Sequence, residues 1–317
     1  MHEVLRDILR TKRRELAVAR ARTPLPELRA RARDLPPPRD FTAAVAPPAA
    51  GDARPERPGR VVAVETTGAV ALIAEIKRAS PSKGALRPDL DPARFAAVYA
   101  EAGASALSVL TDAVFFKGSP DDLRAARAAC RLPVLRKDFL IDPYQVWEAR
   151  EMGADAVLLI ARILSPGQMQ DLDGLARELG LASLFEVHRE DELPAVLDCR
   201  PRLVGVNGRD LDTFQTSLDN CERVGRALPR DVGRVAESGI TTREEVERMG
   251  ACGYNAVLIG EALVRSERPG EKIRELLGTR RDAPPPFSPA TVGDLGSLPP
   301  PPGGAPSDLR TGRKPDA

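Results

Sequence analysis

The sequence predicts an α/β fold in which eight parallel strands close into a (β/α)8 TIM barrel. Short apolar or β-branched runs alternate with helical patterns of ten or more residues through the middle of the chain. One strand and its helix occupy roughly 20 to 35 residues, which is typical of parallel sheets. The strand interiors are almost continuously apolar, as expected where helices cover a sheet. An open sheet with two additional strands stays the structural alternative.

Eight segments have the composition of buried strands. They are Val70–Ile76, Ala106–Leu110, Pro133–Arg136, Ala156–Ile160, Ala182–Phe185, Leu203–Val206, Gly233–Ala236 and Ala256–Ile259. Helical patterns follow them, for example at Pro92–Gly103, Asp121–Cys130, Tyr144–Gly153 and Ser165–Gly180. Eight such units favour a closed barrel over an open, doubly wound sheet.

An additional helix is expected ahead of the first strand. Within residues 4–19, Val4, Ile8, Leu9 and Leu16 fall on one face, with charged residues between them. Repeated prolines at 35–60 are incompatible with a helix or a central strand.

These patterns divide the chain into two parts. We expect one barrel domain at residues 1–282, which includes the first helix and a Pro-rich surface segment at 43–60. Residues 283–317 are rich in proline and glycine and are expected to form a disordered tail.

The composition narrows the function classes. Among 317 residues, 47 basic and 46 acidic side chains leave a net charge of +1, so neither nucleic acid nor a membrane surface is an expected partner. Residues 1–20 lack the pattern of a signal peptide, which makes the cytoplasm the expected compartment. The four cysteines contain no CxxC pair and only two histidines occur, so no metal centre is predicted.

Polar side chains occur at the ends of almost all predicted strands, where a barrel of this kind places its active site. The chain mostly uses arginine as its cation, yet Lys77, Lys83, Lys117 and Lys137 all fall at or beyond the first three strand ends. Lysine can give up its proton and arginine cannot, which indicates a chemical role. Asp112 and Asp138 are ambiguous between loop caps and groups that face a substrate.

The last two strand ends have the composition of a phosphate site. Glu237, Ser238 and Gly239 follow the seventh strand, and Gly260 and Glu261 follow the eighth. Glycines allow backbone N–H groups to approach an anion, and a short helix beginning near Glu261 would direct its positive end toward it.

Several of these segments resemble indole-3-glycerol phosphate synthases, in the same order along roughly residues 1–280. The most specific is AEIKRASPSKG at 74–84. The others are LSVLTD at 107–112, FFKGS at 115–119, PVLRKDF at 133–139, EVH at 186–188, GVNGRDL at 205–211, AESGI at 236–240 and LIGEAL at 258–263. Gly208 stands where an asparagine is common in that family.

The resemblance implies a cofactor-free reaction that converts 1-(2-carboxyphenylamino)-1-deoxyribulose 5-phosphate into indole-3-glycerol phosphate, CO2 and water. Lys137 matches the family's general acid, and Glu186 matches the acid/base group of the final dehydration. Glu75 and Glu237 match carboxylates that hold the lysines and stabilise positive charge on the substrate. Asn207 matches a residue that binds a hydroxyl group.

The remaining matches concern substrate binding. Lys77 and Ser80 match contacts to the substrate carboxylate or phosphate, within a mobile lid at 80–84 that includes Pro81 and Lys83. Phe115, Phe116 and Phe139 are expected beside the mouth of the site, where they could form a wall for the anthranilate ring or be ordinary core residues. The residues that match the phosphate side are Arg209, Ser238, Gly239, Gly260 and Glu261. The family resemblance also favours a monomer.

Two rival functions fit the sequence less well. A phosphoribosylanthranilate isomerase would use a Cys and Asp pair at strand ends, and no cysteine lies at one here. A catalytically silent barrel that recruits partners through its Pro-rich ends would be favoured by loss of Lys137, Glu186 or Glu75, and all three are present.

Overall fold

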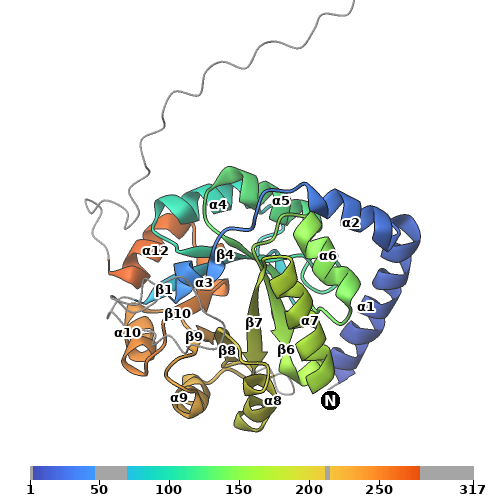
Figure 1. The fold of residues 1–317 in the computed structure, drawn as a ribbon. Coiled ribbons are helices and arrows are strands. Elements are labelled where there is room, and N and C mark those ends of the chain that lie inside the picture. The colour runs from blue at the N-terminus through green and yellow to red at the C-terminus, as the bar shows by residue number, and fades with distance from the viewer. Residues whose placement is uncertain (1–2, 47–69, 211–214, 279–317) are drawn as a thin grey trace, which may run out of the picture. The chain divides into compact units, whose positions relative to one another are not determined.

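Eight parallel strands close into a barrel in the order β1-β10-β9-β8-β7-β6-β5-β4 (Figure 1). The computed structural model describes residues 3–46, 70–210 and 215–278. The barrel strands are β1 (Ala71–Ile76), β4 (Ala106–Leu110), β5 (Val134–Lys137), β6 (Ala156–Ile160), β7 (Ala182–Val187), β8 (Leu203–Asn207), β9 (Gly233–Glu237) and β10 (Ala256–Ile259). The TIM barrel expected from the sequence is confirmed, and the open sheet is excluded.

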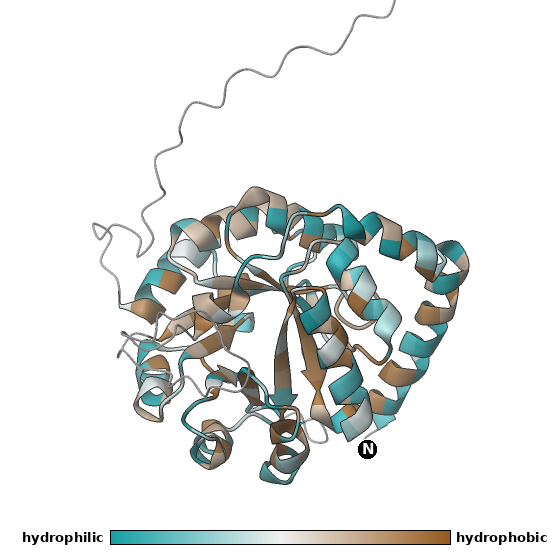
Figure 2. Ribbon diagram, viewed as in Figure 1, coloured by the Kyte–Doolittle hydropathy of each residue, from teal (hydrophilic) through white to brown (hydrophobic). Residues whose placement is uncertain are grey.

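Helices surround the strands and turn their polar faces outward (Figure 2). The helices that follow the first strand are α4 (Pro92–Glu101), α5 (Pro120–Ala129), α6 (Pro143–Glu151), α7 (Pro166–Glu178), α8 (Leu193–Leu197), α9 (Leu218–Ala227), α10 (Arg243–Ala251), α11 (Glu261–Arg265) and α12 (Pro269–Leu277). Four of them begin with the same sequence pattern, a capping residue followed by a proline. Asp91, Ser119, Asp142 and Ser165 each cap a backbone N–H and precede a proline, which fits the first helical turn.

The helix expected ahead of the barrel is present as α1 (Glu3–Arg22), and its buried face overlaps with the expected one. Ile8 and Leu9 are buried as predicted, but Leu5 and Lys12 complete the buried face, whereas Val4 and Leu16 are half-buried. The buried residues are three or four positions apart, which is the spacing of one helix face. Lys12 was not expected on this face, because lysine side chains are usually exposed. A second helix, α2 (Leu25–Arg33), follows directly.

A short helix, α3 (Phe41–Val45), packs onto the apolar cluster that fills the barrel, so Val45 and Ala46 are buried although they were expected in a surface segment. Asp40 caps this helix, and Phe41 and Val45 are fully buried. No proline occurs between Pro38 and Pro47, which allows the turn to form. The remainder of the expected Pro-rich segment and the expected tail, residues 47–60 and 283–317, lie outside the described residues.

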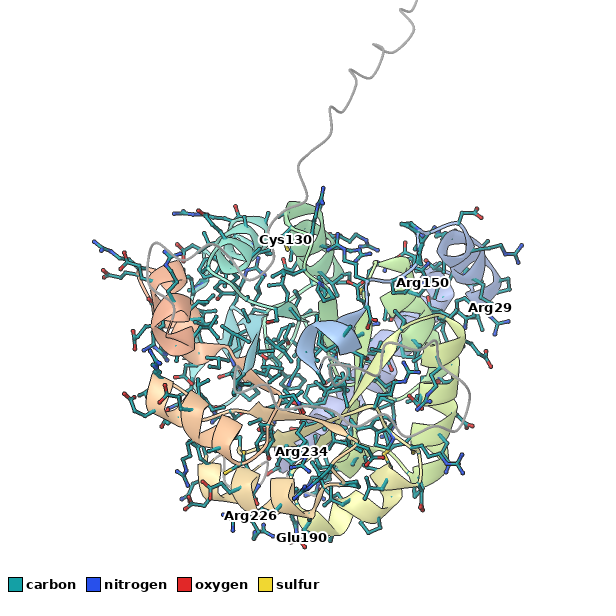
Figure 3. The ribbon with its side chains drawn as sticks, turned by 60° about the vertical axis from the view of Figure 1, so that its left-hand side comes forward. Arg29, Cys130, Arg150, Glu190, Arg226 and Arg234 are labelled. Carbon is teal, nitrogen blue, oxygen red and sulfur yellow. The ribbon has the colours of Figure 1, made fainter. Side chains whose placement is uncertain are left out.

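Two arginines hold the connection between α2 and α3 against the N-terminal ends of the strands. Arg39 donates to the carbonyl oxygens of Cys130 and Leu132 at 3.0 and 2.7 Å. Arg150 donates to the carbonyl oxygens of Leu35 and Pro36, both at 2.8 Å (Figure 3). Hydrogen bonds from arginine side chains to backbone carbonyl groups therefore fasten the connection to this end of the barrel.

Candidate active site

Alternation along the strands places charged side chains directly above the apolar interior of the barrel. Ile73, Leu135, Leu184 and Val235 belong to the interior cluster. Successive side chains of a strand point to opposite faces, so the residue two positions later points inward again. Those residues are Glu75, Lys137, Glu186 and Glu237. They lie within the strands rather than after them, because β5, β7 and β9 extend further than expected.

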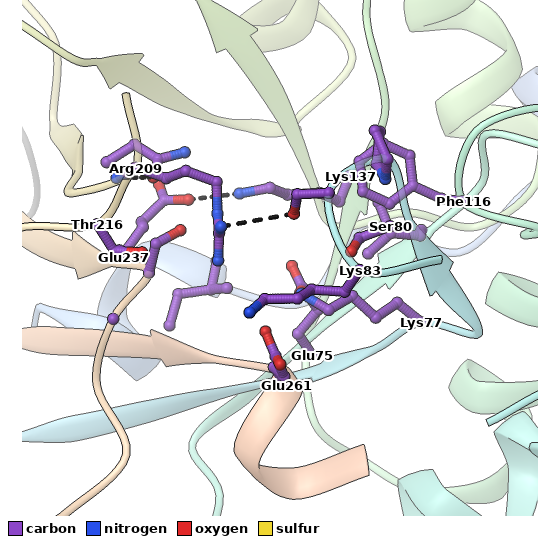
Figure 4. A pocket seen from close by; sticks show the side chains of 18 of the residues that line it. Glu75, Lys77, Ser80, Lys83, Phe116, Lys137, Arg209, Thr216, Glu237 and Glu261 are labelled. Atoms are coloured by element: carbon purple, nitrogen blue, oxygen red, sulfur yellow. Dashed lines mark hydrogen bonds and ion pairs between the residues drawn. The ribbon is translucent and has the colours of Figure 1, made fainter. Parts of the chain in front are cut away.

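Lys137 lies between two carboxylates and is the centre of this layer. Its Nζ atom is 3.1 Å from an oxygen of Glu186 and also pairs with Glu237, toward which it points across the cavity (Figure 4). The side chains of Glu186 and Glu237 are 4% and 1% exposed. Three ionisable groups from β5, β7 and β9 are thus held together away from bulk water.

The pKa values of the two carboxyl groups are shifted in opposite directions. Burial alone would raise the pKa of Glu186, but Lys137 and hydrogen bonds from Lys137 and Asn207 lower it well below its usual range. Burial raises the pKa of Glu237 to about 8, and repulsion from Glu186 adds to this rise, although Lys137 opposes it. One oxygen of Glu237 has no hydrogen-bond partner among the described residues. Glu186 is therefore the stronger acid of the two buried carboxylates.

Lys137 itself is held in its charged form. Burial disfavours the ammonium ion, but Glu237, Glu186 and Glu75 together raise the pKa of Lys137 above its ordinary value. The side chain is 14% exposed and reaches the cavity. The ammonium proton is therefore available to a bound molecule.

A second lysine–glutamate pair lies beside the first. The Lys77 Nζ atom is 2.5 Å from a Glu75 oxygen. Two glycines leave room for the carboxylates: a Cβ atom at Gly260 would lie 2.3 Å from Glu75, and one at Gly205 would lie 2.1 Å from Glu237. Gly260 was expected to admit an anion, but its first effect is to make space for Glu75.

The sixteen residues expected to act in catalysis or substrate binding all line one cavity of about 1010 Å³ at the C-terminal ends of the strands. Phe115 and Lys117 are not among the lining residues, and the carbonyl oxygen of Lys117 instead accepts a hydrogen bond from Arg78 at 3.3 Å. The roles of the lining residues stay predictions.

An aromatic wall forms one side of the cavity. The ring centroids of Phe116 and Phe139 are 6.3 Å apart. Asp112 accepts the backbone N–H groups of Phe115 and Phe116, and Asp138 accepts that of Phe139 and the hydroxyl of Thr111. Both aspartates therefore act as loop caps.

The opposite side of the cavity carries backbone groups and hydroxyls. Ser238 and Gly239 both adopt left-handed backbone conformations, with φ of 67° and 83°. Such a conformation is uncommon for serine and occurs often at functional sites. The expected short helix begins at Glu261, as α11.

A hairpin of β2 (Ala79–Ser80) and β3 (Gly84–Ala85) contributes to the mouth of the cavity. It carries Ser80 and, in its exposed turn, Pro81 and Lys83. Arg209, after β8, donates to the Ser82 hydroxyl at 3.5 Å. The hairpin thus contacts the loop from the other side of the mouth.

His188 supports the acid/base layer from outside the cavity. Its Nε2 atom is 3.4 Å from Glu186, and the residue is 3% exposed. Burial lowers the pKa of His188 and outweighs Glu186 and Glu192. The neutral ring does not line the cavity, in agreement with a structural role.

Sequence reasoning missed several lining residues. Val4, Leu5 and Ile8 come from α1, Gln215 and Thr216 precede α9, and further examples are Thr241, Arg265 and Lys272. Only the first group left a signal, namely apolar residues at helical spacing that extend to the unexpected Lys12.

The described residues contain neither a candidate metal site nor a candidate membrane-spanning helix. No group of three or more His, Cys, Asp or Glu side chains in residues 3–46, 70–210 and 215–278 could hold a metal ion. Within the same ranges, no helix is long and apolar enough to cross a membrane.

Solved structures with a similar fold share little sequence with this chain. A mutant tryptophan synthase α-subunit from Pyrococcus furiosus is 18% identical with a TM-score of 0.52, and covers 67% of this chain and 98% of its own. The 3-hexulose-6-phosphate synthase from Salmonella typhimurium is 13% identical with a TM-score of 0.52, over 66% and 97%. These likenesses support the fold alone.

Sequence relatives are much closer. An indole-3-glycerol phosphate synthase from Albidiferax ferrireducens is 50% identical over 279 residues, which cover 88% of this chain and all of the relative. One from Polaromonas naphthalenivorans is 48% identical over 278 residues, with the same coverage. The family model described as indole-3-glycerol phosphate synthase matches residues 5–276. The chain therefore belongs to the indole-3-glycerol phosphate synthase family.

Proposed function

We propose that this chain, a carboxy-lyase of tryptophan biosynthesis by its family, uses Lys137 as general acid and Glu186 as acid/base group. The reaction is the conversion of 1-(2-carboxyphenylamino)-1-deoxyribulose 5-phosphate into indole-3-glycerol phosphate, CO2 and water. The observation that carries the proposal is the buried Lys137, held between Glu186 and Glu237 where three strands end in the cavity.

Ring closure is the step that needs an acid. The ring carbon that bears the carboxylate attacks the ketone carbon, and the ketone oxygen becomes an alcohol by taking a proton from Lys137. An alkoxide is more basic than an amine, so the transfer is favourable even though the pKa of Lys137 is raised. CO2 then leaves, and its bonding electrons restore the aromatic ring.

Dehydration completes the product. The new hydroxyl group leaves as water, while the nitrogen lone pair supplies electrons and the adjacent carbon loses a proton. Glu186, ionised because its pKa is low, is suited to take part in this proton transfer. Glu75 and Glu237 stabilise the positive charge that develops on nitrogen, and Asn207 is placed to bind a substrate hydroxyl.

Binding is divided between the walls of the cavity. Phe116 and Phe139 contact the anthranilate ring, and Lys77 with Ser80 bind a substrate anion. The phosphate group occupies the side formed by Arg209, Ser238, Gly239, Gly260 and Glu261. Residues 80–84, with Pro81 and Lys83, act as the lid.

We further propose that the chain acts in the cytoplasm as a monomer, without a metal ion or cofactor. It also acts without nucleic acid or a membrane as partner, because its net charge of +1 offers no strong field for either. Residues 1–282 form the catalytic domain, and residues 283–317 are dispensable for turnover.

The test is an assay of purified protein with 1-(2-carboxyphenylamino)-1-deoxyribulose 5-phosphate in the absence of added metal or cofactor. Indole fluorescence should appear with the wild type, and it should fall by a factor of about 10³ with Lys137→Ala. A folded wild-type protein that forms no product would refute the reaction. Unchanged turnover in the variant would refute the role of Lys137.

A further inference from the structure

A lysine of the helix ahead of the barrel is buried against the loops that carry the aromatic wall. Lys12 of α1 is 3% exposed, and its Nζ atom is 2.7 Å from Asp112 and 2.9 Å from Asp138. A third carboxylate, Glu15, is 2.8 Å away on the same helix. Only seven of the 47 basic residues are lysines, and a compact ammonium with three donors suits a site with three carboxylates.

The two aspartates connect Lys12 to the wall of the cavity through hydrogen bonds. Asp112 accepts the backbone N–H groups of Phe115 and Phe116 at 2.6 and 3.1 Å. Asp138 accepts the backbone N–H of Phe139 at 2.8 Å. Each aspartate therefore touches Lys12 with its side chain and fixes the backbone of a phenylalanine that lines the cavity.

Electrostatics makes Lys12 necessary for this arrangement. Burial disfavours its charge, but Asp138 and Asp112 outweigh burial and raise the pKa of Lys12, so the ammonium stays charged. Burial would raise the pKa of Asp138, yet Arg136 and Lys12 together lower it. Without Lys12, two buried carboxylates would face each other with Arg136 as the remaining close cation of this cluster.

We propose that Lys12 is a positioning residue for the aromatic ring of the substrate. Through Asp112 and Asp138, it sets the backbone that presents Phe116 and Phe139, and α1 adds Leu5 and Ile8 to the same cavity. This inference rests on the proposed function and deepens it, because it assigns recognition of the ring to a helix outside the barrel. Among the described residues, no ion pair or hydrogen bond of Lys12, Asp112 or Asp138 reaches a residue of the phosphate side.

The test compares a ligand that has the ring with one that lacks it. Inhibition by indole-3-glycerol phosphate reports on ring and phosphate, whereas inhibition by glycerol 3-phosphate reports on the phosphate side. In Lys12→Met, we expect the first inhibition constant and the substrate KM to rise about tenfold. The second constant should stay within about twofold, because phosphate binding does not depend on the aromatic loops.

A matched control is available on the same helix. Arg20 pairs with Asp142 at 2.6 Å, which ties α1 to the start of α6 without reaching the aromatic loops. Arg20→Met should leave both inhibition constants unchanged. A general loosening of α1 would instead give the same result in both variants.

A second variant keeps the test decisive if Lys12→Met does not fold. Asp112→Ala leaves Lys12 paired with Asp138 and Glu15 but removes the acceptor for Phe115 and Phe116. It should show the same selective loss of ring binding. Equal changes of both constants in a folded variant, or no change in either, would overturn the proposal. An inactive wild type would count against the proposed function instead.

Discussion

The two ends of the barrel treat a buried carboxylate in opposite ways. At the N-terminal ends of the strands, Asp155 accepts the backbone N–H groups of Arg39 and Val134 at 2.6 and 2.8 Å and pairs with Arg127. At the C-terminal ends, Glu237 pairs with Lys137 but keeps one oxygen without a partner among the described residues. The difference indicates that the first end is built for stability, whereas the second retains polar groups for a substrate.

The largest expected effect is on turnover at the C-terminal end. Glu186→Gln should lower kcat by a factor of about 10³, because the amide cannot take up a proton. Stability should change little, since the substitution removes one of two carboxylates that compete for Lys137. Steady-state kinetics and thermal unfolding measure the two quantities. Glu190→Gln is the matched control, because Glu190 is an exposed partner of Arg223; equal kcat losses in both variants would contradict the assignment.

The converse is expected at the N-terminal end. Asp155→Asn should lower the free energy of unfolding by roughly 3 kcal/mol, because Arg127 and a backbone N–H then face an amide group at a fully buried position. Below the unfolding transition, kcat should be unchanged. Urea denaturation followed by an activity assay tests both. The exposed Asp121→Asn should cost about 0.5 kcal/mol or less, and a large kcat loss in Asp155→Asn would remove the distinction between the two ends.

A glycine substitution tests the space that the Glu237 carboxylate needs. A Cβ atom at residue 205 would lie 2.1 Å from the Glu237 oxygen, so Gly205→Ala must displace this carboxylate. A shift of this size should lower kcat by a factor of about 100. Gly174→Ala, on α7 with no atom within 4 Å of the added group, provides the control. Full activity of the first variant would mean that the position of Glu237 is unimportant.

The smallest effect is a pH dependence. Burial raises the pKa of Glu237 to about 8, so the carboxyl is protonated below this pH and ionised above it. In its ionised form Glu237 stabilises the positive charge on the substrate nitrogen, so kcat should rise as the pH increases through about 8, by up to about tenfold per unit. Glu237→Gln should lack this rise, and an identical rise in the variant would assign it to another group.

Sequence patterns predicted the barrel well because it depends on local periodicity, and the family resemblance supplied most of the candidate site. Apolar runs marked the strands, and the family motifs marked residues that the structure gathers in one cavity. The burial of Lys12 could not be predicted in the same way. Its partners Asp112 and Asp138 are about a hundred residues away along the chain, so no local pattern identifies the contact.

The strand ends show a similar limit. Strands β5, β7 and β9 each continue through a charged residue, because Lys137 and the two glutamates compensate one another once the barrel closes. A charged residue at the end of an apolar run otherwise indicates the start of a loop. The asymmetry between Asp155 and Glu237 likewise depends on partners from other segments.

The most direct test of the central claim is the turnover of Lys137→Arg. Arginine keeps the positive charge between Glu186 and Glu237 but does not give up a proton at accessible pH. If Lys137 is the general acid, kcat at saturating substrate should fall by a factor of at least about 100 in a variant that unfolds at the wild-type temperature. A variant with wild-type kcat would show that charge alone suffices, which would contradict the assignment of Lys137 as the proton donor.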